Sequence, residues 1–352
     1  MWGELLDKQT VSTLLGDKFE LVYVKATSTL HDVMRLLHDK RLLSVPVLDE
    51  DKARFVGSVD VLDVVSGATM LESASELVKA LCAHNKVDVD YEELLRREHS
   101  EFSKQTVGVV CNTSQRNQWR TVRESDSLDQ LLRVFARDPH CHRVAVLRDG
   151  ADGDKHGAAD VIGIISQSRV IKYLAENADA TGGLPDTLAR IERSDLRGVT
   201  VTTVPKAMQA AEAYRTMLEA KVSAAGIVDD DGKLVGVLSA SDFKRSVGGN
   251  PFSDLSMDVL SYVTLTSPGD GDGAASVAGG GSRSVVPVTC KIGTLIVDVL
   301  KRLRDEHVHR MFVIDDAQKP LATLALYDLL ALFSAYASLE TFRDALSAMA
   351  KP

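Results

Sequence analysis

The sequence predicts an α+β fold (mixed α/β) made of four copies of one β-α-β-β-α unit. Four times along the 352-residue chain, a short apolar strand is followed by a second apolar strand and then by the start of a helix. An internal repeat of this kind fixes the architecture and places equivalent residues at equivalent positions, so that differences between the copies are informative too. The paired segments are 44–49 with 55–63, 143–147 with 161–169, 225–229 with 234–242, and 311–315 with 321–328.

Each unit is expected to open with a short strand, at 21–24 in the first copy and at 199–202 in the third. A helix start follows, and in the second copy Asp126 is the expected N-cap, with Asp129 in the first turn near the positive helix end. The helix itself has apolar residues at intervals close to 3.6, which predicts one buried face. Examples are Leu128, Leu131, Leu132 and Phe135 in the second copy, and Leu295, Val299, Leu300 and Leu303 in the fourth.

One unit is too small to bury both faces of its sheet, so two intramolecular pairs of units are expected. Residues 71–103 are rich in Leu, Glu and Arg and predict helices between the first two units. Residues 177–186 mark the boundary between the pairs, and the Gly-rich stretch 267–284 predicts a flexible insertion. The predicted repeats are 10–70, 104–176, 190–248 and 255–336.

The overall composition excludes several classes of function. Apolar residues make up 45% of the chain and charged residues 26%, as in ordinary globular proteins, and no stretch is apolar enough to span a membrane. A net charge of −9 argues against general binding of nucleic acid or of an anionic membrane. The four cysteines have no paired spacing, which favours reduced thiols in a cytoplasmic or nuclear protein.

The first candidate binding feature is the junction between the last strand of a unit and its second helix. In the third copy, Gly236, Ser239 and Asp242 bring together a close backbone approach, a hydroxyl and a carboxylate. A carboxylate can accept both hydroxyls of a ribose, whereas the hydroxyl and the helix start favour phosphate oxygens. Asp242 could also be only a helix cap, but the carboxylate recurs at Asp63 and Asp328. Arg169 replaces it in the second copy, and a cation is unfavourable as a cap.

The second feature is a basic dipeptide that precedes the middle strand in alternate copies. His142-Arg143 and His309-Arg310 stand at equivalent positions, where the other two copies have Leu43-Ser44 and Ser223-Ala224. In a pair of repeats with pseudo-twofold symmetry, one repeat could thus direct its positive side chains toward the centre that both repeats share. Arginine has a planar guanidinium that can donate two hydrogen bonds to a phosphate. A solvated, purely structural basic rim is the alternative.

Metal binding and catalysis have weaker support. His140 with His142, and His307 with His309, could face the same way on a strand, but no further ligand completes a site, so no metal is expected. No nucleophile–base order, pair of catalytic acids or dinucleotide fingerprint occurs, which indicates a binding protein and not an enzyme.

These segments resemble tandem CBS (cystathionine β-synthase) domains, and in particular the gamma subunits of AMP-activated protein kinase. The resemblance runs from about residue 10 to 336 and is most specific in 165–174, 221–229, 235–243 and 308–316. It implies four repeats in a disc that bind AMP, ADP or ATP as regulatory ligands. Ribose would then lie on Asp242, Asp328 and Asp63; hydroxyl and backbone contacts would come from Ser239, Ser166, Val222, Ser223 and Ala224; phosphates would meet His142, Arg143, His309, Arg310 and Arg169.

The chain also departs from that family pattern. Leu43 stands where the gamma subunits have a phosphate-binding arginine, and Asp60 stands where a hydroxyl is usual, beside Asp63. Two carboxylates in one junction would repel phosphate. Ser168 replaces a lysine, and in the fourth copy Ala322 and Ala325 replace the glycine and the hydroxyl. Highly charged nucleotides should therefore bind less tightly, with the third and fourth repeats as the best sites.

The leading hypothesis is a non-catalytic subunit that senses adenine nucleotides within an energy-sensing kinase complex, with kinase catalytic and scaffold subunits as partners. A stand-alone CBS protein that binds S-adenosylmethionine and regulates another enzyme is the main alternative. A structural interaction subunit, in which the aspartates are only caps, is a third. A homodimer through the pairs is also possible, and neither nucleic acid nor a membrane is an expected partner.

Overall fold

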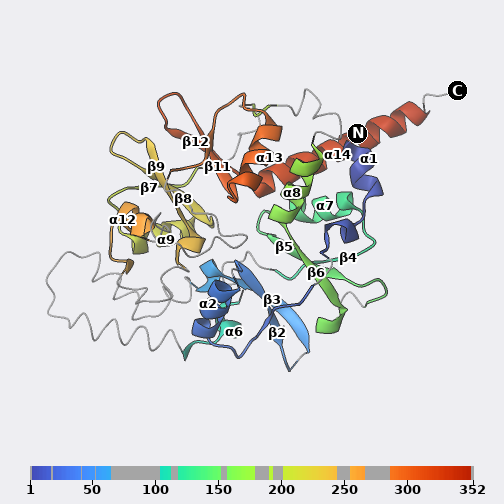
Figure 1. The fold of residues 1–352 in the computed structure, drawn as a ribbon, viewed down its shortest axis with the longest axis horizontal. Coiled ribbons are helices and arrows are strands. Elements are labelled where there is room, and N and C mark those ends of the chain that lie inside the picture. Colours follow the sequence, from blue (N-terminus) through green and yellow to red (C-terminus); the bar gives the residue numbers. More distant parts are fainter. Residues whose placement is uncertain are drawn as a thin grey trace, which may run out of the picture.

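A computed structural model of the chain has four small sheets set in a ring, with helices between them (Figure 1). Two predicted features, the helical connector 71–103 and the Gly-rich insertion 267–284, lie outside the described residues, as does most of the boundary at 177–186. The described residues are 2–16, 19–40, 42–51, 53–64, 104–111, 118–151, 157–178, 190–192, 201–243, 254–265 and 286–349.

Every sheet has three strands, and the middle strand pairs in parallel with the first and antiparallel with the last. The parallel pair requires a crossover, and a ten-residue helix supplies it in each repeat. The strands are β1 Val24–Lys25, β2 Ser44–Asp49, β3 Arg54–Asp60; β4 Thr121–Arg123, β5 Arg143–Leu147, β6 Val161–Ser166; β7 Thr203–Pro205, β8 Ala224–Val228, β9 Leu234–Ser239; β10 Thr289–Cys290, β11 Arg310–Ile314 and β12 Pro320–Ala325.

The helices have the amphipathic spacing that the sequence predicts, but Leu295, which was expected on the buried face of the fourth copy, is the exposed N-cap of α13 (Ile296–Asp305). Leu128, Leu131, Leu132 and Phe135 of α7 are all buried. The crossover helices are α2 Leu30–Asp39, α7 Leu128–Arg137, α9 Ala210–Glu219 and α13 Ile296–Asp305. The other helices of the described residues are α1 Trp2–Lys8, the short 3₁₀ helix η1 Val11–Leu14, α6 Val107–Val110, the 3₁₀ helix η2 Ala158–Asp160, α8 Gln167–Asn177, α10 Ala240–Phe243, α12 Val259–Leu265 and α14 Leu326–Met349.

The predicted N-cap of α7 was wrong by one residue. Ser127 caps this helix in a capping box with Gln130, whereas the Asp126 carboxylate accepts a hydrogen bond from the Arg123 backbone N–H at 2.7 Å. Asp126 thus closes the turn between strand and helix. Side-chain oxygens of Ser28 and Thr294 do the same in the first and fourth repeats.

The first strands of the first and third repeats were also placed too early: β1 is Val24–Lys25, whereas 21–24 was predicted. Residues 201 and 202 lie outside a strand, and β7 begins at Thr203, which pairs with Gly226 of β8. The alternating Val and Thr residues at 199–202 fit a strand equally well, and only pairing with β8 sets the register. Pro205 ends β7 and has no backbone N–H, so no side-chain oxygen is needed three residues later to accept one. The residue at the position of Asp126 is accordingly Met208, which has no such oxygen.

Within each half of the chain, the segment that leads into one repeat pairs with the other repeat. Thr10 forms a β-bridge with Ser127, and Thr106 forms one with Thr29. Arg190 and Leu295 repeat the arrangement in the second half, as do Asp258 and Gln209. This exchange ties repeat one to repeat two and repeat three to repeat four, which confirms the two intramolecular pairs.

The hydrophobic cores join repeats from different pairs and so close the ring. One core combines repeats two and four, where α7 and α8 pack against α13 and α14. A second core combines repeats one and three. Repeat one contributes Leu37 and Val47, among others, and repeat three contributes Tyr214 and Phe243. A small cluster around Phe55 and Ala145 joins the sheets of repeats one and two. The predicted α+β fold of four repeats in a disc is therefore confirmed.

The structure also bears on membrane insertion. Among the described helices, none combines the length and the apolar character that a membrane span requires.

Candidate nucleotide-binding junctions

Three carboxylates lie at matching places, three residues after the end of the last strand of their repeat. Asp63 and Asp242 are buried, and Asp328 is half-buried. One oxygen of each accepts a backbone N–H from the residue three positions earlier: Asp60 N at 3.0 Å, Ser239 N at 2.7 Å and Ala325 N at 2.7 Å. Each aspartate thus supports its own strand-to-helix turn, and this local role is compatible with a ligand on the carboxylate.

Burial makes the Asp328 carboxylate costly to ionise. Desolvation raises the pKa of Asp328 above its usual value, against the opposing effects of the Ala325 N–H and the Arg310 charge. A partner that donates hydrogen bonds to this carboxylate would offset the desolvation cost.

In the second repeat the junction holds Arg169 in place of a carboxylate. Its backbone N–H is capped by the Ser166 hydroxyl at 3.3 Å, and its Nε donates to the carbonyl of Leu14 at 3.1 Å. Part of the Arg169 guanidinium is thus engaged by η1 near the N-terminus of the chain. Its predicted role in phosphate binding remains a proposal.

The two features singled out in the sequence are neighbours in the fold. The backbone carbonyl of His142 accepts a hydrogen bond from Gln167, the first residue of α8, at 3.1 Å. His309 and Ser223 make the same bond with the residue that follows their own junction, Leu326 at 3.2 Å and Ala240 at 3.0 Å. In these three repeats, the residue before the middle strand therefore lies against the junction of the same repeat.

Arg310 connects the third and fourth repeats. It begins β11 opposite Ala325, at the junction of its own repeat, and it acts electrostatically on Asp328. Its Nη1 donates to the carbonyl of Ala224 at 3.4 Å, and its Nη2 contacts the Ser223 hydroxyl. Ala224 in turn lies opposite Ser239. One guanidinium thus lies between the two junctions of this pair.

Arg143 has the same position between the first and second repeats. It begins β5 opposite Ser166, and its Nη1 donates to the carbonyl of Ser44 at 3.3 Å. Ser44 lies opposite Asp60 in the first repeat. Desolvation lowers the pKa of Arg143 to about 10, although the Asp60 charge acts in the opposite direction. Arg143 therefore stays charged at neutral pH.

The first junction has a carboxylate pair that the other described junctions lack. Asp60 Oδ1 accepts the Asp63 N–H at 2.9 Å, while Asp63 Oδ2 accepts the Asp60 N–H. The two side chains form a reciprocal capping box, so both are fixed in place. The corresponding residue is Ser166, Ser239 or Ala325 in the other repeats.

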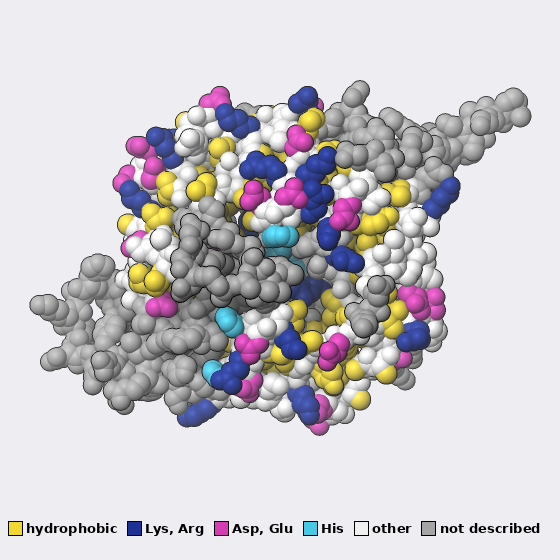
Figure 2. Space-filling view, in the orientation of Figure 1, with side chains coloured by type: hydrophobic (Ala, Val, Ile, Leu, Met, Phe, Trp, Pro, Cys, Tyr) yellow, Lys and Arg dark blue, Asp and Glu magenta, His cyan; other side chains and the backbone are white. Residues whose placement is uncertain are grey.

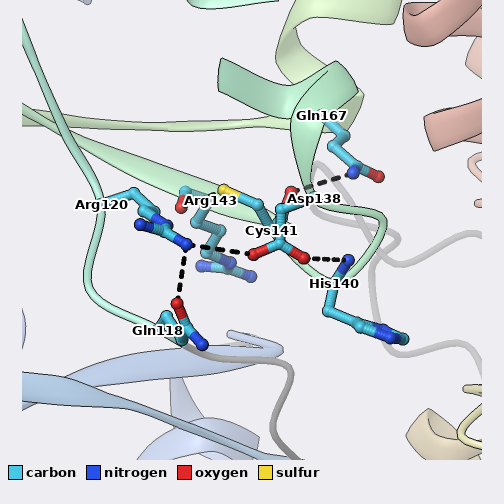
Figure 3. A network of polar contacts seen from close by, with 7 residues as sticks. All are labelled: Gln118, Arg120, Asp138, His140, Cys141, Arg143 and Gln167. Carbon is cyan, nitrogen blue, oxygen red and sulfur yellow. Dashed lines mark hydrogen bonds and ion pairs between the residues drawn. The ribbon is translucent and has the colours of Figure 1, made fainter. Parts of the chain in front are cut away.

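The loop that carries His142 and Arg143 is held by a polar network that the sequence did not reveal (Figure 3). Asp138 accepts the His140 N–H at 2.9 Å and lies 3.6 Å from Arg120, and Gln167 Nε2 donates to the Cys141 carbonyl at 2.9 Å. Burial raises the pKa of Cys141 to about 12, so this thiol is not a nucleophile at neutral pH. Pro139, next to Asp138, was the one available signal for an unusual helix end here.

The remaining predicted residues lie around the same places. Val222 and Ser223 are half-buried and Ala224 is buried, directly before and at the start of β8. His142 is half-buried and His309 is exposed. Figure 2 shows histidine side chains near the middle of one face, with basic side chains beside them. Within the described ranges, no three His, Cys, Asp or Glu side chains form a group that could hold a metal ion.

Neither sequence feature alone revealed the reach of Arg143 and Arg310 into the neighbouring repeat. The alternation of basic and neutral dipeptides was the available signal, because each arginine contacts the residue at its own position in the paired repeat. Arg143 contacts Ser44, and Arg310 contacts Ala224.

Comparison with known proteins identifies a matching family. The family model of the CBS domain matches residues 17–68, 116–176, 195–249 and 283–335. The gamma subunit of 5'-AMP-activated protein kinase from Saccharomyces cerevisiae is 21% identical over 339 residues, which cover 93% of this chain and 90% of that protein. Protein sds23 of Neosartorya fischeri is 28% identical over 155 residues, 44% of this chain and 27% of the relative.

Among solved structures, a Methanocaldococcus jannaschii protein proposed to be an archaeal homologue of g-AMPK has a similar fold. Its TM-score is 0.63 at 15% identity, and the match covers 92% of this chain and all of that one.

Proposed function

The chain belongs to the CBS-domain family, and on that premise we propose that it is a non-catalytic regulatory subunit that senses adenine nucleotides. AMP, ADP or ATP would be its regulatory ligand. The full-length similarity to kinase gamma subunits supports the catalytic and scaffold subunits of a protein kinase as partners, in the cytoplasm or nucleus.

The bridge made by Arg310 is the observation that carries this proposal. The carboxylates Asp242 and Asp328 are the groups that would accept the hydroxyls of ribose. The guanidinium that lies between their junctions is the group that would bind phosphate, and His309 adjoins it in the chain. A nucleotide has both kinds of functional group, so it matches the charge pattern of the third–fourth pair.

Signalling would follow from where the ligand binds. A nucleotide held by residues of two repeats would change how these repeats pack, and the two cores would pass this change to the other pair. A ligand can shift the equilibrium between two states of a partner complex only if it binds one state more tightly than the other. Contacts of one nucleotide with two repeats can supply such a difference in affinity.

Isothermal titration of the full chain with AMP, ADP and ATP tests the proposal. Asp242→Asn and Asp328→Asn keep an acceptor for the backbone N–H of Ser239 or Ala325 but remove the charge that would hold a ribose diol. We expect nucleotide affinity to fall at least about tenfold in each variant, with unchanged folding. A control substitution, Asp230→Asn in the exposed β8–β9 hairpin, should leave binding unchanged.

The acidic first junction favours one alternative ligand. Asp60 and Asp63 would tolerate the positive sulfonium of S-adenosylmethionine better than a phosphate. Titration with S-adenosylmethionine therefore belongs in the same experiment. Binding of that ligand alone would favour a stand-alone CBS regulator, and absence of binding to a folded sample would leave only a structural role.

A further inference from the structure

The four junctions differ in charge at the residue that ends the last strand. The first repeat has Asp60 there, whereas the second and third have the hydroxyls of Ser166 and Ser239 and the fourth has Ala325. We propose that Asp60 is a specificity determinant: it engages the charge of Arg143 and so closes the first–second pair to phosphate, which directs phosphate binding to the third–fourth pair. This inference rests on the proposed function.

The geometry brings Asp60 and Arg143 to the same corner. Asp60 is paired with Ser44 across β2 and β3, and directly opposite residues in an antiparallel pair have Cα atoms about 4.5–5.5 Å apart. Arg143 reaches the carbonyl of that same Ser44 at 3.3 Å. The pKa of Arg143 responds to the Asp60 charge, so the two groups are coupled electrostatically.

The Asp60 carboxylate is also fixed in place. Its Oδ1 accepts the Asp63 N–H at 2.9 Å, and Asp63 returns a bond to the Asp60 N–H. A phosphate that approached Arg143 would therefore meet a stationary negative charge nearby. Like charges at close range in a partly desolvated corner disfavour such binding.

The third–fourth pair lacks this obstacle. Arg310 contacts two neutral groups of its partner repeat, the Ser223 hydroxyl and the Ala224 carbonyl. The residue opposite Ala224 is Ser239. Asp242 and Asp328 stand at the third position after the strand, as Asp63 does, and the second repeat has Arg169 there. A carboxylate at the end of the strand itself, opposite the residue that the bridging arginine contacts, occurs only at Asp60 among the four junctions.

Reciprocal exchange of the two residues tests the inference. Asp60→Ser gives the first junction the residue of the third, and Asp60→Asn removes the charge but keeps an acceptor for the Asp63 N–H. Ser239→Asp transfers the obstacle to the third junction. Each full-length variant is titrated calorimetrically with AMP and with adenosine, which lacks the phosphate, and circular dichroism checks its fold.

We expect Asp60→Ser and Asp60→Asn to add a second AMP site, or to tighten AMP binding about tenfold or more, with little change for adenosine. Asp60→Ser combined with Asp242→Asn should retain this gained site. Ser239→Asp should weaken AMP at least about tenfold more than adenosine.

Unchanged AMP stoichiometry and affinity in both Asp60 variants would overturn the inference, even if the wild-type chain binds AMP and the proposed function stands. Conversely, a wild-type chain that binds no nucleotide would contradict the proposed function. AMP binding gained only in the Asp60 variants would still support the role of this residue.

Discussion

At the scale of single residues, each carboxylate in these junctions has a structural role and a proposed role in ligand binding, and the sequence does not separate the two. Asp63, Asp242 and Asp328 each accept a backbone N–H of their own turn, as a structural cap would. They also lie beside the residues before the middle strands, where a ligand would meet them. Only the measured effect of a variant on binding, compared with its effect on stability, distinguishes these roles.

Asp328 predicts a pH dependence of stability. Its pKa is raised in the folded chain by burial, so the folded state binds its proton more tightly than the unfolded state does. Stability from this group should therefore be greatest at low pH and should decline as the pH rises from about 4 through the raised pKa. Asp328→Asn should remove that part of the decline, as measured by urea unfolding at intervals between pH 4 and pH 7.

The control for this experiment is Asp316→Asn, at an exposed hairpin position where the Lys291 ammonium lowers the pKa of the carboxyl. Its contribution has the opposite sign: stability falls as the pH drops through the lowered pKa. An Asp328→Asn profile parallel to that of the wild type would contradict the prediction.

At the scale of elements, the hairpins between the last two strands show the same turn built from different residues. In the third repeat, Gly232 has φ +79° and its N–H donates to Asp229 O at 3.0 Å. In the fourth repeat, Gln318 has φ +63° and donates in the same way to Asp315 O at 3.1 Å. The left-handed backbone costs Gln318 energy that glycine does not incur.

We therefore expect Gln318→Gly to stabilise the protein by about 0.5–1 kcal/mol, and Gly232→Gln to destabilise it by a similar amount. The side chain of Gln318 is exposed, and a Cβ at Gly232 would first meet the flexible end of the Lys319 side chain, 3.8 Å away at the closest, so backbone strain should dominate both changes. Thermal unfolding of this matched pair is the measurement. Shifts of the same sign in both variants would disprove the argument.

At the scale of the whole molecule, each pair of repeats depends on the other for its cores. Repeats two and four share one core and repeats one and three share the other. The sheets, by contrast, meet within a pair, through the contacts of Phe55 with repeat two and of Gly226 with Phe312. Separation of the pairs would thus expose a half of each core.

This arrangement predicts that the halves 1–178 and 190–352 will not be stable monomers. Each half made alone should self-associate or aggregate, because its helical faces, with side chains such as Leu132 or Phe333, lose their cover. The two halves made together should form a one-to-one complex, which size-exclusion chromatography with light scattering can measure. A monomeric 1–178 fragment with cooperative unfolding would contradict the shared cores. A homodimer of the intact chain remains a prediction.

The sequence by itself determined the repeat, the strand pairs and the helix faces, because each of these is written in local periodicity. It also indicated which residues differ between copies, such as Asp60 and Arg169. It misplaced the cap at Asp126, because several oxygens could close one turn. It also misplaced the strands at 21–24 and 199–202, because a short apolar or alternating segment does not set its own register.

Only the tertiary structure decided which repeats share a core and which groups each arginine meets. Arg143 and Arg310 contact carbonyls that are 99 and 86 residues away in the chain. Such contacts depend on how the repeats pack, and no pattern within one repeat encodes them. The physical reason is that a guanidinium binds whichever acceptors the fold brings within reach, so the chemistry of this site lies between the repeats.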